Sequence, residues 1–410
     1  MRWQLPWSRK AEGGTIRSAS ELLKALGLGN ITNSGAAVTL ETALRVSTVL
    51  ACARVIADGL AQVPLKLYRD TDGRKTPARD HPLWDKLHSR PSEVQTSFEF
   101  RETMALHLVL AGRFVAFKNV VRGRVEELLP LDPNGVTVKA PARLGERPTY
   151  HVQFDGRMQE LSADQVWHVK GPSWNGWDGM HAIRQAREAI GLAIASEQSQ
   201  ARLHANGLRT SGTYSVEGKL QTKDYTDLLA FLRQHWGGSD KHALPMIVDR
   251  SAKWLPHTMT GVDAQAIETR RYQVEEICRA LRVMPIMVGY SDKAATYASA
   301  EQMFLAHVVH TLAPWVARIE QSIDAHLLTE EDRRAGYYSH FTLDGLQRGA
   351  MKDRDDYLAK ALRSGGSPAW MTQDEVRALE ELNPMGGTAA VLPVATNVPK
   401  SPVDPAPAGA

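Results

Sequence analysis

The chain has 410 residues, 43 % of them hydrophobic and 23 % charged, and its formal net charge is +3. This length allows two or three domains with substantial cores. The nearly balanced charge argues against a nucleic-acid binder that works through one large basic face, although looser contact with a polyanion stays open. No stretch reaches the ~18 apolar residues that span a bilayer, and MRWQLPWSRK does not have the pattern of a secretory signal. We therefore expect no membrane association and a protein that is cytosolic or assembles in the cytosol.

The two cysteines, Cys52 and Cys278, fall in helical patterns far apart in the sequence. Two buried thiols in a reducing compartment are the expected arrangement, with a structural disulfide as the alternative.

The first 170 residues predict a mixed α+β domain. Residues 1–39 are mostly polar, and helical patterns follow from Glu41 to Leu60 and from Phe98 to Ala111. Six strands are expected around these helices, and turns rich in glycine, proline and aspartate separate them. The strands are VPLKLY, FVAFKNVV, VEELLPL, GVTVKA, TYHVQF and QVWHVK.

Helices dominate the second half. A loop with Trp174 and Trp177 opens a helix expected from Met180 to Asn206, whose apolar stripe is thin. Such a helix more often packs against copies of itself or lines an aqueous space than forms the core of a monomer. A small insert is expected next, with the strands GTYSV, LPMIV and KWLPHTM and a helix over residues 222–236.

An amphipathic helix is expected after the insert, over residues 263–283. Asp263 is its predicted cap, and Pro285 stops it because the residue before a proline is pushed out of the α region. Its apolar face has Ile267, Val274, Ile277 and Leu281, and its charged side chains elsewhere are Glu268, Arg271, Glu275, Arg279 and Arg282.

A further helix is expected to begin at Ser299, the first residue of a capping box with Gln302. Pro314 lies inside it and predicts a kink near residues 310–314. Its predicted apolar stripe is Leu305, Val308, Leu312, Val316, Ile319, Ile323 and Leu327. The strand YYSHFTL, helices near residues 348–363 and 372–382, and a disordered tail complete the chain.

The chain shows no motif of an enzyme. It lacks a phosphate-binding loop, a dinucleotide fingerprint, a nucleophile elbow and a zinc-protease motif. His307 and His310 have a spacing that fits a metal, but no carboxylate or cysteine near them in sequence completes a site. Trp174 and Trp177 fit either a ligand clamp or, preferably, a loop anchored against a neighbouring surface. We expect no catalytic residue, metal or cofactor.

Four stretches, in this order, resemble the portal proteins of tailed double-stranded DNA bacteriophages, in the lambdoid-type portal family. They are GRFVAFKNVVRGRVEELLPLDPNGVTV, WNGWDGMHAIRQAREAIGLAIASEQSQARLHANGLRTSG, VDAQAIETRRYQVEEICRALRVMPIMVGYSDKAATYASAEQ and HTLAPWVARIEQSIDAHLL. The resemblance extends over most of residues 40–380. It implies a ring, typically of twelve subunits, at one capsid vertex, assembled in the host cytoplasm and carried in the virion. Double-stranded DNA passes through its channel during packaging and ejection, without sequence specificity.

The resemblance also implies a division of the chain into parts. A flexible segment, residues 1–39, precedes an α+β wing, residues 40–179. Two stem helices, residues 180–206 and 263–283, flank a small α/β clip, residues 207–262. The parts that follow are the tunnel loop (284–298), the second part of the wing (299–347), the crown helices (348–385) and the disordered tail (386–410).

The implied functional residues lie in the tunnel loop and on the second stem helix. The loop residues expected near DNA are Tyr290, Ser291, Asp292, Lys293, Thr296 and Tyr297. Glu268, Arg271, Glu275, Arg279 and Arg282 form the charged face expected between subunits, for which a merely solvated face is the alternative. The implied partners are other copies of the chain, the terminase large subunit, a head–tail connector or adaptor, and the major capsid and scaffold proteins.

Two other functions stay open on the sequence alone. A phage DNA-processing enzyme would need an acidic metal cluster or a nucleophile constellation, and nuclease or ATPase activity would favour it. A head-assembly adaptor that never forms a ring would be a stable monomer, and the thin apolar stripe of residues 180–206 argues against it.

Overall fold

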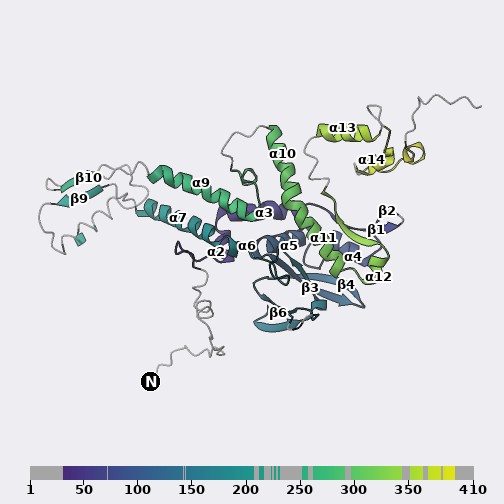
Figure 1. Ribbon diagram of the computed structural model, residues 1–410, viewed down its shortest axis with the longest axis horizontal. Coiled ribbons are helices and arrows are strands. Elements are labelled where there is room, and N and C mark those ends of the chain that lie inside the picture. The colour runs from purple at the N-terminus through teal and green to yellow at the C-terminus, as the bar shows by residue number, and fades with distance from the viewer. Residues whose placement is uncertain are drawn as a thin grey trace, which may run out of the picture. The chain divides into compact units, whose positions relative to one another are not determined.

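The structure, a computed structural model, describes residues 31–71, 73–141, 143, 145–206, 212–216, 223, 226–227, 230, 252–256, 262–290, 297–343, 351–362, 368–379 and 382–392 (Figure 1). Contacts divide the chain into two units, Met1–Thr342 and Leu343–Ala410. The mixture of abundant helices and small sheets confirms the predicted α+β class.

The described part of the first unit contains four small antiparallel sheets. Their strand orders are β11-β1-β2, β4-β3-β8, β5-β6-β7 and β10-β9. The strands are β1 (Leu65–Thr71), β2 (Arg74–Pro77), β3 (Arg113–Val121), β4 (Arg124–Leu131), β5 (Val136–Lys139), β6 (Thr149–Phe154), β7 (Arg157–Leu161), β8 (Val166–Lys170), β9 (Gly212–Val216), β10 (Ala252–Pro256) and β11 (Tyr337–Phe341). The predicted strand LPMIV and most of residues 222–236 lie outside the described residues.

Helices surround these sheets in the first unit. They are α2 (Leu40–Leu44), α3 (Ser47–Ala61), α4 (Pro82–His88), α5 (Ser97–Ala111), α6 (Ala182–Gln185), α7 (Arg187–Asn206), α9 (Val262–Leu281), α10 (Tyr297–His307), α11 (Ala313–His326) and α12 (Glu330–Arg334). Shorter turns are the 3₁₀ segments η2 (Ala163–Gln165) and η4 (Pro285–Val288) and the π-helical turn η5 (Val308–Leu312).

Helix α3 is the centre of the core. It packs against α5, α9, η4 and η5, and Val49, Cys52, Ala53 and Ala57 on it are fully buried. Small side chains at these positions let the neighbouring helices approach closely. On one face of the β4-β3-β8 sheet, the fully buried Trp167 meets Phe114 edge to face at a ring-centroid distance of 5.6 Å and stacks with Phe100 of α5. A separate buried cluster, which includes Val115 and Tyr150, joins this sheet to the β5-β6-β7 sheet.

Two of the predicted long helices are broken. The helix expected over Glu41–Leu60 is α2 and α3, because Val46 adopts an extended conformation (φ −75°, ψ 112°) and caps α3. The helix expected to begin at Met180 begins instead at Ala182 and is interrupted at Ala186, which separates α6 from α7. The backbone N–H of Met180 instead donates to Pro172 in the preceding loop.

The helices on either side of the loop also start earlier than expected. Helix α9 begins at Val262, so Asp263 lies in its first turn instead of capping it. Helix α10 begins at Tyr297, so Ser299 is inside it and the expected capping box is wrong. Leu305, which the sequence assigns to the buried stripe, is 50 % exposed, whereas the later members from Val308 onward are buried.

Two short helices occur in the part of the second unit that the structure describes. They are α13 (Met351–Ala361) and α14 (Gln373–Leu379), followed by the 3₁₀ turn η8 (Gly387–Ala390). The capping box predicted at Thr372 is confirmed, since its hydroxyl accepts from the Glu375 N–H and the Glu375 carboxylate accepts from the Thr372 N–H. Asp374 accepts from the backbone of Met385 and Gly386, so the first residues assigned to the disordered tail are held against α14.

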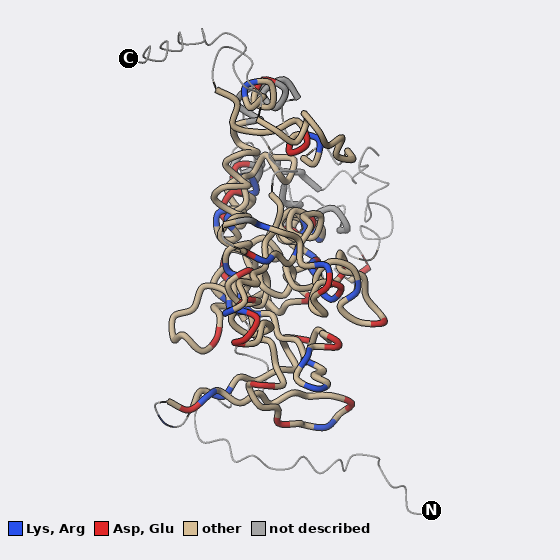
Figure 2. Tube along the Cα trace, turned by 90° about the vertical axis from the view of Figure 1, so that its right-hand side faces the viewer, with Lys and Arg blue, Asp and Glu red and all other residues tan. Residues whose placement is uncertain are grey.

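Charges of both signs are interspersed along the chain. Figure 2 shows short blue and red segments alternating over the described residues, in agreement with the net charge of +3. Among those residues, no helix is both long enough and apolar enough to cross a membrane.

Candidate functional site

The paired helices α7 and α9 lie side by side (Figure 1), and two side-chain hydrogen bonds join them. The side-chain amide of Gln273, only 4 % exposed, donates to the Ser196 hydroxyl at 3.3 Å. Closer to the C-terminal end of α7, the Arg270 guanidinium donates to the Gln200 side chain at 2.8 Å. The thin apolar stripe of α7 therefore has a reason, because this interface is built from hydrogen bonds in addition to apolar packing.

The predicted charged residues of α9 lie away from its buried face. Glu268, Arg271, Arg279 and Arg282 are exposed, and Glu275 is half-buried. The buried face instead carries Gln273, Ile277, Cys278 and Leu281, which contact the rest of the unit. The structure thus separates a packed face from a charged face, and leaves open the predicted contact between subunits.

Arg282 ends α9 in a left-handed conformation, with φ +57°. The N–H of Val283 donates to the Cys278 carbonyl, and the N–H of Arg282 to the Arg279 carbonyl. These two bonds form a Schellman motif, in which the left-handed residue is usually glycine. Arginine at this position is strained by roughly 1 kcal/mol relative to glycine, so its side chain needs a compensating contact.

That contact joins the end of α9 to a turn 28 and 29 positions further along the chain. The Arg282 guanidinium donates to the backbone carbonyl of His310 at 3.1 Å, and the Arg282 carbonyl accepts from the Thr311 hydroxyl at 2.8 Å. Both partners belong to the π-helical turn η5, which follows α10. The joint formed in this way ties the end of α9 to the turn that follows α10, which lies eleven residues beyond Tyr297, where α10 begins.

The described part of the loop begins with the tight turn η4. Gly289 follows in a left-handed conformation, φ +76°, and the N–H of Tyr290 donates to the Pro285 carbonyl at 3.1 Å. Tyr290 is half-buried. Ser291, Asp292, Lys293 and Thr296 lie outside the described residues, and Tyr297 is the first residue of α10.

The long helix after the loop loses its regular hydrogen bonding directly before Pro314. The π-helical turn η5 occupies Val308–Leu312, and Pro314 is in the first turn of α11. A proline lacks an N–H and its ring pushes against the preceding turn, which accounts for the irregularity at this place. His307 is buried with both ring nitrogens unpaired, and burial lowers its pKa.

A short N-terminal segment lies against α7, a contact that the sequence did not predict. Ile31 and Ala37 form a β-bridge, and the N–H of Asn33 donates to the Glu188 carboxylate at 3.0 Å. A Cβ placed on Gly191 would lie 2.5 Å from the Thr32 side chain, so only glycine allows this approach. The only feature of the sequence that indicates this contact is a glycine inside a helical pattern.

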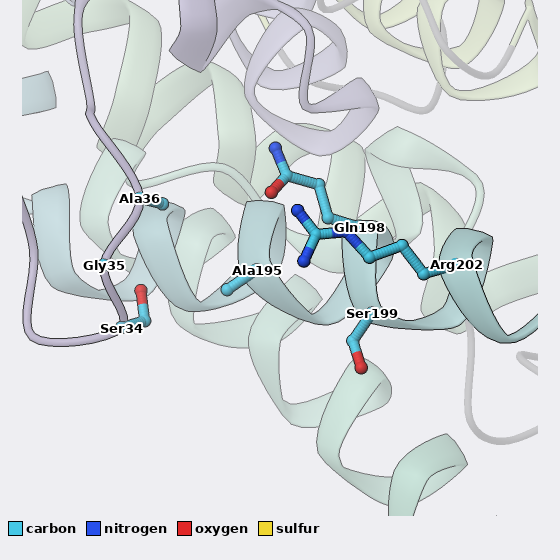
Figure 3. A pocket seen from close by; sticks show the side chains of 7 residues that line it. All are labelled: Ser34, Gly35, Ala36, Ala195, Gln198, Ser199 and Arg202. Atoms are coloured by element: carbon cyan, nitrogen blue, oxygen red, sulfur yellow. The ribbon is translucent and has the colours of Figure 1, made fainter. Parts of the chain in front are cut away.

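Between this segment and α7 is an open polar pocket of about 460 Å³ (Figure 3). In Figure 3 the Arg202 side chain turns back along α7 toward Gln198, while Ser34 and Gly35 border the other side. Besides the face of α7 that contacts α9, the helix therefore has a second polar face, which lines this pocket.

Side-chain contacts fix the conformation of the tryptophan-rich loop. The Asn175 side chain accepts from the backbone N–H groups of Trp177 and Asp178, and the Asp178 carboxylate binds the buried Arg113 guanidinium at 2.6 Å. Trp174 is nevertheless 93 % exposed. Its anchoring against a neighbouring surface stays a prediction.

No cluster of three or more metal-ligating side chains occurs among the residues that the structure describes. His307 and His310 are no exception, because His307 is buried whereas His310 is exposed.

The phage portal protein family matches residues 47–381, which is most of the chain. The chain belongs to the phage portal protein family. The portal protein of Enterobacteria phage HK97 is 29 % identical over 365 residues, 88 % of this chain and 84 % of the relative. The probable portal protein of Streptomyces phage phiC31 is 28 % identical over 377 residues, 87 % of this chain and 79 % of the relative.

Solved structures agree on the fold. The crystal structure of an HK97 family phage portal protein from Corynebacterium diphtheriae matches with a TM-score of 0.56 and 17 % identity, over 76 % of this chain and 97 % of that one. A chain in the neck of an empty gene transfer agent particle, computed with C6 symmetry, matches with a TM-score of 0.59 and 23 % identity, over 86 % and 98 %.

Family membership confirms the expected portal function and its placement in the virion, and makes this a structural protein rather than an enzyme.

Proposed function

We propose that the chain forms a closed ring whose central channel carries double-stranded DNA into and out of the capsid. Membership of the portal family carries this proposal. One of the similar solved chains belongs to a neck computed with C12 symmetry, and its TM-score is 0.57 with 22 % identity over 83 % of this chain and 93 % of that one. A heterologous contact that closes by rotation forms such a ring.

The segments of the proposed subunit follow the elements. The wing comprises residues 40–179 and 299–347, the stem comprises α7 and α9, and the clip lies between them over residues 207–262. Residues 284–298 form the tunnel loop, and residues 348–385 form the crown. The polar pairing of α7 and α9 supports the stem, because these helices have exposed polar faces that neighbouring copies can cover.

The tunnel loop is proposed to meet DNA without holding it. Each tight phosphate contact adds affinity and therefore raises a barrier to sliding. A loop with Lys293 as its one cation fits this requirement. The joint of Arg282 with His310 and Thr311 fixes the end of α9, from which the chain enters the loop. Clip and wing would then offer surfaces to the terminase large subunit, the head–tail connector, and the capsid and scaffold proteins.

The ring is tested by the mass of the purified protein. Size exclusion with light scattering should give a particle near twelve times the 45.3 kDa of one chain, and negative-stain images of that peak should show a central hole. A monomer at every salt concentration and also after co-expression with the neighbouring capsid genes would contradict the ring.

A charge reversal tests the stem face. Arg279→Glu should lower the fraction of protein in the ring, because it places an acid where the proposed contact has a base. Arg157→Glu on β7 is the matched control, since both side chains are exposed and the change in charge is equal. If Arg279→Glu does not change the fraction of protein in rings, Arg279 is not part of the contact between subunits. The proposal of a ring would still hold.

The role of the loop is tested in packaging. Phage that carry Lys293→Ala, or a loop shortened between Ser291 and Thr296, should package or retain DNA less efficiently than the wild type. If both variants behave as the wild type does, the loop is passive.

A further inference from the structure

The fold brings together the only two cysteines of the chain, which are 226 positions apart. Cys52 lies in the middle of α3 and Cys278 in the last turn of α9. Both are fully buried, and their Sγ atoms are 3.7 Å apart. From the sequence the disulfide was only the alternative to two separate buried thiols, because neither spacing nor neighbouring residues connect the two positions.

The separation is close to that of a disulfide. An S–S bond is about 2.05 Å long, so the two sulfurs need to approach by roughly 1.7 Å. Rotation of the two side chains together with a small shift of α9 against α3 supplies such a movement. No other thiol competes, since the chain contains no third cysteine.

We propose that Cys52 and Cys278 are the site of a reversible disulfide within one chain, which links α9 covalently to α3. In the presence of a diazene oxidant such as diamide, one thiolate adds to the N=N bond. The second thiolate then attacks the sulfur of that adduct, which forms the S–S bond and releases the hydrazine. Both thiols lose their protons and together two electrons, which the hydrazine gains.

The hydrogen bond between the two thiols supports this reaction, because it stabilises a thiolate on one sulfur beside the thiol of the other. The thiolate is the nucleophile in disulfide chemistry. Because both sulfurs are buried, the reaction waits for a transient opening between α3 and α9.

The link would act at the base of the loop. Cys278 provides the carbonyl that accepts from the Val283 N–H, and so belongs to the Schellman motif of Arg282. Oxidation would fix this end of α9 to the central helix of the core, whereas reduction leaves only packing contacts between them. The oxidised protein should therefore unfold at a higher temperature, as expected for a link that closes a long loop of chain.

The test uses the folded full-length protein. It is incubated with diamide, denatured in the presence of a maleimide, and weighed by mass spectrometry. We expect the number of maleimide tags per chain to fall from two to zero and the untagged mass to fall by that of two hydrogen atoms. A non-reducing gel should show no linked dimer, and dithiothreitol should restore both thiols. The midpoint of thermal unfolding should rise on oxidation.

The single variants Cys52→Ala and Cys278→Ala are the controls, and each should keep its remaining thiol under the same treatment without losing any mass. The proposal is overturned if the wild type keeps both tags while the denatured chain oxidises, which would show that the pair is only core packing. Disulfides formed only between chains, or a midpoint that does not rise on oxidation, would overturn it equally.

Discussion

The carbonyl of Arg282, the left-handed residue that ends α9, accepts a hydrogen bond of 2.8 Å from the Thr311 hydroxyl. Residues 29 positions apart are thereby joined where α9 ends. The bond uses a hydroxyl that is only 7 % exposed, in a turn whose π-helical geometry already departs from the regular pattern. Regular helices would bring neither group to this place.

Removal of the Thr311 hydroxyl should loosen this joint. Thr311→Val keeps the shape of the side chain but leaves the Arg282 carbonyl without its partner, and we expect a loss of about 1–3 kcal/mol of stability. Thr311→Ser keeps the hydroxyl and is the matched control. Thermal unfolding at fixed protein concentration gives the comparison, and equal midpoints for the two variants would show that the bond contributes nothing.

Gly191 should not tolerate alanine, although it lies inside a helix. Alanine normally stabilises a helix by about 1 kcal/mol over glycine. Here its Cβ would lie 2.5 Å from the Thr32 side chain, so the segment that begins at Ile31 must move away from α7. Limited proteolysis should then cut this segment faster in Gly191→Ala than in the wild type.

Ser199→Ala is the control for that experiment, because it is an exposed position on the same helix and brings only the gain in helix propensity. Equal cleavage rates in Gly191→Ala and Ser199→Ala would contradict the tight approach of the segment.

The hydrogen bond between Gln273 and Ser196 should show strong coupling in a double-mutant cycle. Ser196→Ala alone leaves a buried amide without its partner, which costs about 1–3 kcal/mol. Ser196→Ala combined with Gln273→Leu removes both polar groups, and should recover much of that loss. Additive effects of Ser196→Ala and Gln273→Leu would mean that the two side chains are independent.

Stability should fall in mild acid because of His168. Its ring is 8 % exposed and bonded through Nδ1 to the Tyr150 hydroxyl at 3.2 Å. Burial, reinforced by Lys170, Arg113 and His326, lowers the pKa of His168 from 6.5 to about 3. Between these values the unfolded chain binds a proton that the folded chain does not, so stability decreases as the pH falls through this window.

The expected loss from His168 is about 2 kcal/mol between roughly pH 7.5 and pH 5. His168→Gln keeps a polar group near Tyr150 but does not titrate. Thermal midpoints measured over this range should therefore depend less on pH in the variant. An unchanged pH dependence would assign the acid sensitivity to other groups.

The sequence by itself determined the family, the α+β class, most strands and the approximate positions of the helices. These depend on local patterns of apolar residues and on turn chemistry, as the confirmed box at Thr372 and Glu375 illustrates. The strands that escaped prediction, β2 and β7, are short and mostly polar. These two strands form because a neighbouring strand provides hydrogen-bond partners for their backbone. Their own sequences show no alternation of apolar and polar side chains from which a strand could be predicted.

Only the tertiary structure decided which distant residues meet. Arg282, at the left-handed end of α9, meets His310 and Thr311 because the turn before α11 packs within reach of its side chain and carbonyl. Gly191 is needed because the Thr32 side chain lies against it, and Cys52 faces Cys278 because α3 packs against α9. Local sequence sets the energy of each segment alone, whereas these contacts depend on how segments far apart in the chain pack together.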